Sequence, residues 1–149
     1  MKIIKYFFEF IIIITFFFIF KIIGYRNASN LGEKIGKIFG PLFRSSHVIQ
    51  KNLENLNDSY SHNEKKNIIK NMWGNYGRIF AEYMYLEKFR NNVLSSNIEI
   101  NGQKILDEIK SKKEPVIFVS GHFNNFELMA MHLEKSGINL AAIYRPLNN

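Results

Sequence analysis

One histidine and one glutamate of this sequence stand at a spacing that could support general-base chemistry. His122 and Glu127 are five positions apart. On a continuous helix they would be rotated roughly 140° from each other, because each residue turns about 100°. They can meet only if His122 lies in a loop and Glu127 lies in the first turn of the next helix, where the helix dipole favours a carboxylate. The carboxylate would fix the imidazole tautomer and leave the other ring nitrogen free to accept a proton.

The residues around this pair predict a strand, a sharp turn and a helix. Residues 116–119 form a continuous β-branched and aromatic run, which is typical of a strand buried on both faces. Gly121 permits a sharp turn, and Asn124 or Asn125 can cap a helix over residues 125–135. The alternative is a loop histidine beside a glutamate that only caps a helix, since roughly one such sequence in three would contain this spacing by chance.

The C-terminal part of the sequence, residues 93–149, predicts α/β structure. It contains candidate strands and helices in alternation, at residues 98–100, 103–110, 116–119, 125–135 and 140–144. This βαβαβ order implies a mainly parallel sheet, in which ligands bind beyond the carboxyl ends of the strands. His122 and Arg145 both follow predicted strands. Because three strands and two helices make a poor closed domain, we expect residues 93–149 to be the first part of a truncated α/β domain.

Residues 25–92 predict a helical segment. Ser61 and Glu64 have the spacing of a capping box ahead of a long helix. The apolar stripe of that helix includes the single tryptophan, and we expect it to pack in a core. Gly36 and Gly40 are interpreted as breaks in the chain. His132, within the predicted helix 125–135, is expected to have a structural role.

Residues 1–24 predict a membrane anchor. Glu9 and Thr15 are the only polar side chains within residues 6–20, and with the apolar residues after Lys21 the run reaches about 18 residues, near the lower limit for crossing a bilayer. A cleaved signal peptide would have a shorter apolar core. A helix in a soluble core would need a thick shell of protein around it. A retained anchor is favoured, and basic residues at both of its ends leave its orientation open.

The composition narrows the possible partners. Lys and Arg number 20 against 13 acidic residues, which gives a net charge of +7. This excess suits an anionic membrane, a phosphate-bearing substrate or an acidic protein. Nucleic acid is not expected, because the sequence has neither zinc-finger spacing nor an RNP-like aromatic motif. The sequence has no cysteine, so disulfides, thiolate nucleophiles and cysteine metal sites are excluded.

Residues 120–127, Ser-Gly-His-Phe-Asn-Asn-Phe-Glu, resemble the first block of the lipid A biosynthesis lauroyl/myristoyl acyltransferases, within the lysophospholipid acyltransferase-like superfamily. That family typically shows Gly-His-Phe-Gly-Asn-Trp-Glu, so Asn124 replaces a glycine and Phe126 replaces a tryptophan. The histidine, Asn125 and the glutamate are kept. Residues 144–149 look like the second block of the family. The resemblance covers nearly the whole chain but only the front half of the family's length.

The resemblance implies an O-acyltransferase at the cytoplasmic side of the bacterial inner membrane. A fatty acyl chain would pass from acyl carrier protein to a hydroxyl of a lipid A precursor, with His122 as general base and Glu127 as its orienting partner. Arg145 would hold a lipid phosphate or stabilise the oxyanion, and Asn125 would cap the helix or contact the substrate. No metal or cofactor beyond the acyl donor is expected. The expected partners are membrane lipid, the lipid A precursor and acyl carrier protein.

Two alternatives stay open. A glycerophospholipid acyltransferase of the same superfamily would use the same histidine chemistry, although those enzymes generally carry aspartate at the acidic position. A non-catalytic, membrane-anchored interaction module would bind anionic lipid through its basic residues, and the histidine and glutamate would be only a loop residue and a cap. Loss of activity on His122→Ala would separate an enzyme from such a module.

Overall fold

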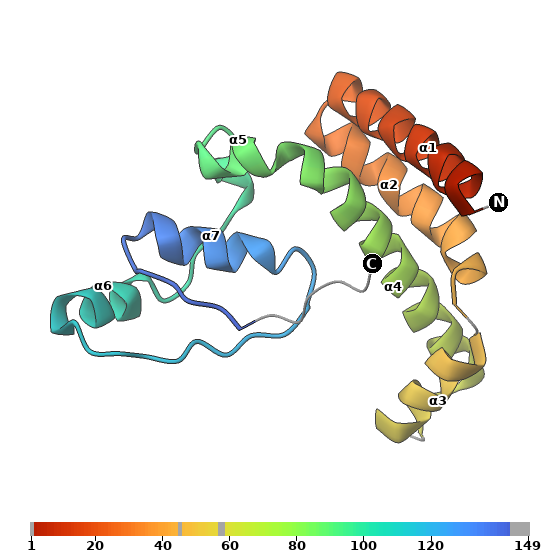
Figure 1. The fold of residues 1–149 in the computed structure, drawn as a ribbon. Coiled ribbons are helices and arrows are strands. Elements are labelled where there is room, and N and C mark those ends of the chain that lie inside the picture. Colours follow the sequence, from red (N-terminus) through yellow and green to blue (C-terminus); the bar gives the residue numbers. More distant parts are fainter. Residues whose placement is uncertain (1, 45, 57–58, 144–149) are drawn as a thin grey trace. The chain divides into compact units, whose positions relative to one another are not determined.

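The computed structural model describes residues 2–44, 46–56 and 59–143 (Figure 1). The chain divides into two units, Met1–Tyr85 and Leu86–Asn149. The first unit contains α1 (Lys2–Ile23), α2 (Tyr25–Phe39), the 3₁₀ turn η1 (Gly40–Leu42), α3 (Ser46–Leu56), α4 (His62–Glu82) and the 3₁₀ turn η2 (Tyr83–Tyr85). The second unit contains α5 (Leu86–Arg90), the 3₁₀ turn η3 (Ser95–Asn97), α6 (Gln103–Lys112) and α7 (Glu127–Lys135).

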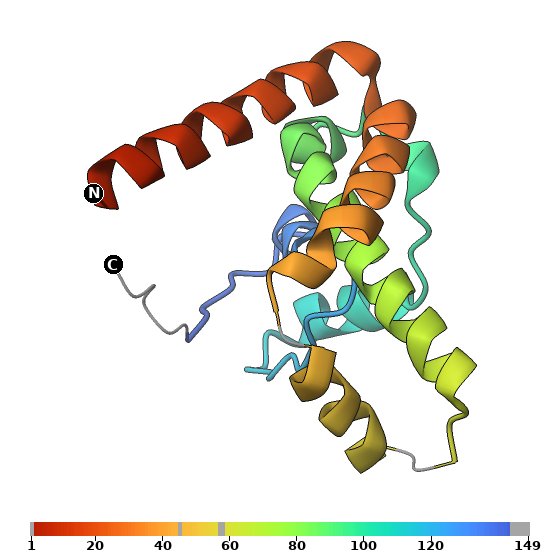
Figure 2. The same ribbon diagram turned by 90° about the vertical axis from the view of Figure 1, so that its right-hand side faces the viewer.

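Helix α1 is apolar and is mostly uncovered by protein. Its segment Ile3–Ile23 is long and apolar enough to cross a membrane, and only 6% of its most apolar window is buried within the structure. Helix α1 contacts the rest of its unit near its C-terminal end. There the rings of Phe17 and Phe20 lie 5.0 and 6.2 Å from the ring of Phe80. The buried Tyr85 hydroxyl donates a hydrogen bond to the Phe20 carbonyl. Figure 2 shows the remainder of α1 leading away from α2 and α4. The predicted apolar helix is therefore confirmed, and its insertion into a membrane stays a prediction.

Helices α2 and α4 lie side by side and meet through small residues (Figures 1 and 2). The contacting positions are Ala28, Gly32 and Gly36 of α2, and Gly74, Gly77 and Ala81 of α4. A Cβ on Gly77 would overlap the Gly32 carbonyl oxygen, and a Cβ on Gly36 would overlap the Trp73 carbonyl oxygen. The interpretation of Gly36 as a chain break is therefore wrong, because this glycine lies inside α2 and allows the backbones to approach. α2 does end beside Gly40, as expected.

The start of α4 follows the predicted capping box. The Glu64 amide donates to Ser61 Oγ at 3.3 Å, and the Ser61 amide donates to Glu64 Oε2 at 2.8 Å. The Ser61 hydroxyl also donates to Glu64 Oε2, at 2.7 Å, and this bond, together with the one from the Ser61 amide, lowers the pKa of the Glu64 carboxyl below its ordinary value. The bulky stripe of α4 is less buried than we expected, since Tyr76 is exposed while the small residue Ala81 is fully buried. The tightest packing of α4 therefore comes from its small residues.

The predicted α/β class is wrong for the part of the chain that the structure describes, which is helical and contains no strand or sheet. Helices α6 and α7 form near their predicted positions. The segments at 98–100, 116–119 and 140–143 are not paired as strands. Ile117 and Val119, which were expected to be buried, are 91% and 90% exposed. The physical reason is that β-branched residues favour extended backbone, but a parallel strand also needs a neighbour that supplies its hydrogen bonds.

In the C-terminal unit α5 packs against α7, and a side-chain contact links α6 to α7. Phe89 of α5 and Leu133 of α7 are buried, and Arg90 pairs with Glu134 at 2.6 Å. His132 Nε2 lies 2.9 Å from Gln103 Oε1, which links α7 to α6. This contact is in accord with the structural role predicted for His132.

Candidate functional site

The loop that precedes α7 carries His122. The Phe123 amide donates to the Gly121 carbonyl at 2.8 Å, which closes a tight turn around His122. Asn124 follows with φ 48°, in the left-handed region that asparagine tolerates better than most residues. These two local features bend the chain between the extended segment and α7. The histidine consequently lies at the surface rather than on a helix.

The imidazole of His122 is held by an aromatic contact. Its ring lies edge-to-face with Phe126, with the centroids 4.4 Å apart and the planes at 65°. Such a contact favours one ring orientation over the others. Phe126 is also the residue that precedes the first turn of α7. The aromatic side chain therefore couples the orientation of His122 to the start of the helix.

Glu127 is the first residue of α7 and is half-buried. A carboxylate there interacts favourably with the positive end of the helix dipole. His122 lies in the loop and Glu127 in the first turn, which is the placement that their spacing requires if they are to meet. A hydrogen bond between their side chains is what the general-base hypothesis needs, and it stays a prediction.

Asn125 lies between these two residues, with its amide group buried. Neither Oδ1 nor Nδ2 has a hydrogen-bond partner within the described part of the protein. The residue at the N-cap of α7 is Phe126, and the helix has no side-chain cap. The prediction that Asn125 caps the helix is therefore wrong. A buried amide normally has hydrogen-bond partners, which water or a bound molecule can supply, so binding of substrate by Asn125 stays a prediction.

Two further expectations concern Arg145 and metal ions. Arg145 lies at 144–149, outside the described residues. Among the residues that the structure does describe, no group of three or more His, Asp or Glu side chains could hold a metal ion. A small cavity of about 70 Å³ in the C-terminal unit is lined by Phe89, Leu128 and His132 among others, but not by His122. It is far smaller than typical ligand pockets of about 300–1,000 Å³.

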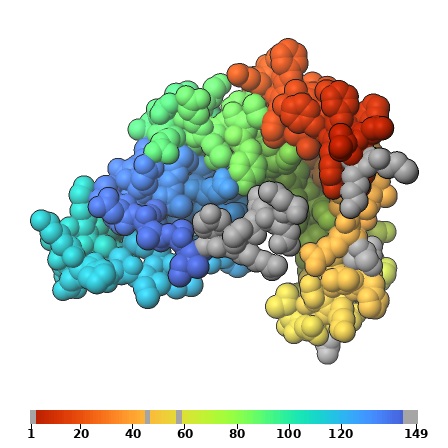
Figure 3. Space-filling view, viewed as in Figure 1, coloured from red at the N-terminus to blue at the C-terminus, as the bar shows by residue number. Residues whose placement is uncertain are grey.

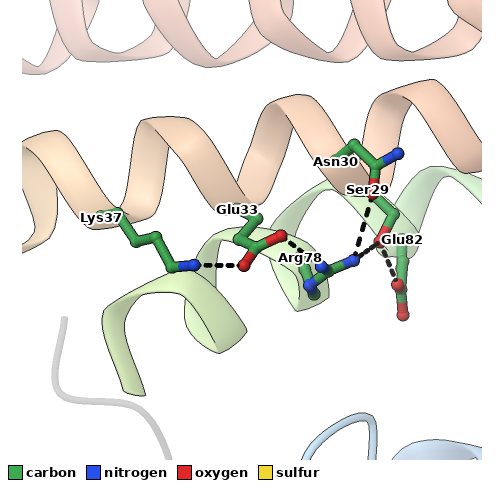
Figure 4. Close-up of polar contacts among 6 residues, drawn as sticks. All are labelled: Ser29, Asn30, Glu33, Lys37, Arg78 and Glu82. Atoms are coloured by element: carbon green, nitrogen blue, oxygen red, sulfur yellow. Dashed lines mark hydrogen bonds and ion pairs between the residues drawn. The ribbon is translucent and has the colours of Figure 1, made fainter. Parts of the chain in front are cut away.

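A second polar cluster, which the sequence did not indicate, lies between α2 and α4 (Figure 4). Arg78 donates to Ser29 Oγ at 3.2 Å and pairs with Glu33, while Ser29 donates to Glu82 at 2.7 Å. Lys37 also pairs with Glu33. The hydrogen bond from Lys37, assisted by the Arg78 guanidinium, holds the pKa of the Glu33 carboxyl below its ordinary value. A carboxylate held between two cations is a poor base, so this cluster is structural.

Comparison with known protein families identifies the class of protein. Residues 1–149 match the family model described as bacterial lipid A biosynthesis acyltransferase, and the chain belongs to that family. This match confirms the resemblance carried by the residues around His122. No match was found among the curated proteins or among the solved structures.

Proposed function

We propose that this chain supplies the catalytic base of an O-acyltransferase that moves a fatty acyl chain from acyl carrier protein to a hydroxyl of a lipid A precursor. Membership of the lipid A biosynthesis acyltransferase family supports the reaction class. The observation that carries the residue assignment is the placement of His122 in a bent surface loop directly before a helix that begins at Glu127. That is the placement that the five-residue spacing requires if a histidine base is to meet its orienting carboxylate.

The proposed reaction is a direct transfer. One imidazole nitrogen of His122 takes the proton from the acceptor hydroxyl as its oxygen attacks the carbonyl carbon of the acyl thioester. The new C–O ester bond forms and the C–S bond breaks, and the imidazolium returns the proton to the departing thiolate of the carrier protein. Glu127 would accept a hydrogen bond from the other ring nitrogen and stabilise the imidazolium.

Asn125 and Arg145 complete the proposed site. The buried amide of Asn125 has an unused donor and acceptor, which suits a polar group of the bound substrate. Arg145 would hold a phosphate of the precursor, because a guanidinium matches the geometry of phosphate oxygens. No metal or other cofactor takes part in this scheme.

The acceptor is tested by comparing two substrates. Full-length protein would be supplied with a radiolabelled acyl chain on acyl carrier protein, and with either a lipid A precursor or a lysophospholipid as acceptor. We expect the label to enter the lipid A precursor. Transfer to the lysophospholipid alone would replace this proposal with the glycerophospholipid alternative. Binding of lipid that does not depend on His122, with no acyl transfer, would favour a non-catalytic module.

Phe126 is expected to act as a positioning residue. Phe126→Ala removes the ring that lies against His122, so the rate of acyl transfer should fall by about tenfold while the KM for the acceptor changes little. Phe126→Trp keeps an aromatic ring beside His122 and introduces the residue that is typical of the family motif. This variant should retain most of the rate of the unchanged protein. The measurement is kcat and KM for each variant with the labelled acyl donor. A rate for Phe126→Ala equal to that of the unchanged protein would show that the ring contact has no role.

We also propose that α1 anchors the protein in the bacterial inner membrane, with His122 on the cytoplasmic side. The uncovered apolar surface of α1 supports insertion, because soluble proteins rarely leave so large an apolar surface in water. The connection of α1 to the rest of its unit through its C-terminal end would leave the other helices outside the apolar layer.

Membrane insertion should depend on the exposed residues of α1. Ile12→Lys combined with Ile13→Lys adds two charges to side chains that make little contact with the protein, and each charge near a bilayer centre costs about 2.5–3.5 kcal/mol. The double variant should be largely released by a carbonate wash, whereas unchanged protein and an Ile12→Leu, Ile13→Leu control should stay in the membrane pellet. Recovery of unchanged protein as a soluble monomer without detergent would refute the anchor.

A further inference from the structure

A basic pocket lies between the end of α2, α3 and the first half of α4. Its volume is about 770 Å³. Four lysines line it, Lys37, Lys65, Lys66 and Lys70, together with His62, Gln50 and Glu54, and its apolar lining includes Pro41, Ile69 and Trp73. Figure 3 shows α3 (yellow) standing out from the molecular surface beside the end of α2. The pocket belongs wholly to the N-terminal unit and contains none of the residues proposed for catalysis.

The positive charge of this pocket is only partly neutralised by the protein. Lys37 pairs with Glu33, and Lys65 pairs with Glu54 at 3.3 Å. Lys66 and Lys70 have no acidic partner among the residues that the structure describes. Lys66 and Lys70 are four residues apart, so they lie on the same side of α4. Like charges at this spacing disfavour the helix, and an anion in the pocket would remove that penalty.

Exposed apolar residues flank, along the chain, one of the residues that line this pocket. We define this apolar edge as Ile38 and Phe39 at the end of α2, together with Leu42 and Phe43 in and after η1. Leu42 and Phe43 are 80% and 82% exposed. Pro41, which lines the pocket, lies directly between the two halves of this edge in the chain. A free anion would use the lysines but would leave this apolar edge in water.

We propose that the basic pocket binds the phosphate of an anionic membrane lipid while the apolar edge enters the outer part of the lipid layer. Lysine ammonium groups supply the point charges that hold a phosphate. Apolar side chains beside a cationic cluster are the combination that binds proteins to an anionic bilayer surface. The site would give the N-terminal unit a second attachment to the membrane into which α1 is proposed to insert. It is separate from the acyl acceptor site and does not depend on the acyl transfer reaction.

The single tryptophan makes the pocket measurable, because Trp73 is the only tryptophan of the sequence and lines the pocket. The full chain in non-ionic detergent would be titrated with dihexanoyl phosphatidic acid while Trp73 emission is recorded. We expect a saturable change that neutral dihexanoyl phosphatidylcholine does not produce. Lys66→Gln with Lys70→Gln should weaken the binding by about tenfold or more. Lys34→Gln with Lys51→Gln removes the same charge from surface positions outside the pocket, and it should leave the affinity within about twofold.

Inorganic phosphate separates a lipid site from a simple anion site. It should bind far more weakly than the lipid, and Leu42→Ser with Phe43→Ser should abolish that difference without changing phosphate binding. The altered side chains are exposed, so circular dichroism should show unchanged folding. The proposal is overturned if Trp73 gives no saturable response, if both lysine pairs weaken binding equally, or if inorganic phosphate binds as tightly as the lipid.

Discussion

Replacing Gly77 by alanine is expected to destabilise the N-terminal unit by about 1–3 kcal/mol, although alanine is the better helix former. The added methyl group would overlap the carbonyl oxygen of Gly32 in the facing helix. Backbone cannot rotate aside as a side chain can, so α2 and α4 would have to separate. That movement would also strain the hydrogen bonds of Ser29 and Arg78 (Figure 4). The midpoint of thermal unfolding, followed by circular dichroism in detergent, would report the loss.

Gly74→Ala is the matched control for this prediction. It lies on the same helix and also faces α2, but its Cβ would meet the flexible Lys37 side chain, at 2.8 Å from Cε. That side chain can move, so the helix propensity of alanine should offset most of the cost. Gly36→Ala should behave like Gly77→Ala, because it would press on the Trp73 carbonyl. Equal unfolding midpoints for all three variants would show that α2 and α4 do not approach as closely as the structure indicates.

Replacing His122 by alanine in the full-length protein is expected to lower the rate of acyl transfer by about 10²–10⁴-fold, the usual contribution of a general base. Acceptor binding should change much less, because the histidine acts mainly in the transition state. His47→Ala is a suitable control, since His47 is an exposed histidine on α3, far along the chain from the proposed site. Its rate should stay normal. A folded His122→Ala protein with a normal rate would remove the basis for the catalytic assignment.

The helices of this chain could be predicted largely from the sequence. The capping box at Ser61 and Glu64 marked the start of α4, and apolar spacing located α6 and α7, because these signals are local. The sheet could not be predicted in the same way. The β-branched run at 116–119 indicates extended backbone, but strand pairing depends on residues distant in sequence, and no pairing occurs in the described part of the chain.

For the candidate site, the sequence predicted the turn at Gly121 and the position of Glu127 at the start of a helix, because a glycine and a change of periodicity mark such a boundary. It did not predict that α7 would lack a side-chain cap or that the Asn125 amide would be buried, since asparagine serves equally well as a cap. The close approach of α2 and α4 does have a signal in the sequence, because the small residues Ala28, Gly32 and Gly36 recur every four residues. Glycines at helical spacing indicate helix contact as readily as chain breaks.

The most direct test of the central claim is a double-mutant cycle on His122 and Glu127, measured as transfer of a labelled acyl chain from acyl carrier protein to the lipid A precursor by the full-length protein. Glu127→Gln alone should cost about 10²-fold or more, because the imidazole loses its fixed tautomer. Circular dichroism should accompany the rates, since removing a carboxylate from a helix N-terminus can cost up to about 1 kcal/mol of stability. If the two residues act as one unit, the double variant should be slower than His122→Ala by no more than about threefold. A double variant whose loss equals the product of the two single losses, or folded single variants with near-normal rates, would contradict the account.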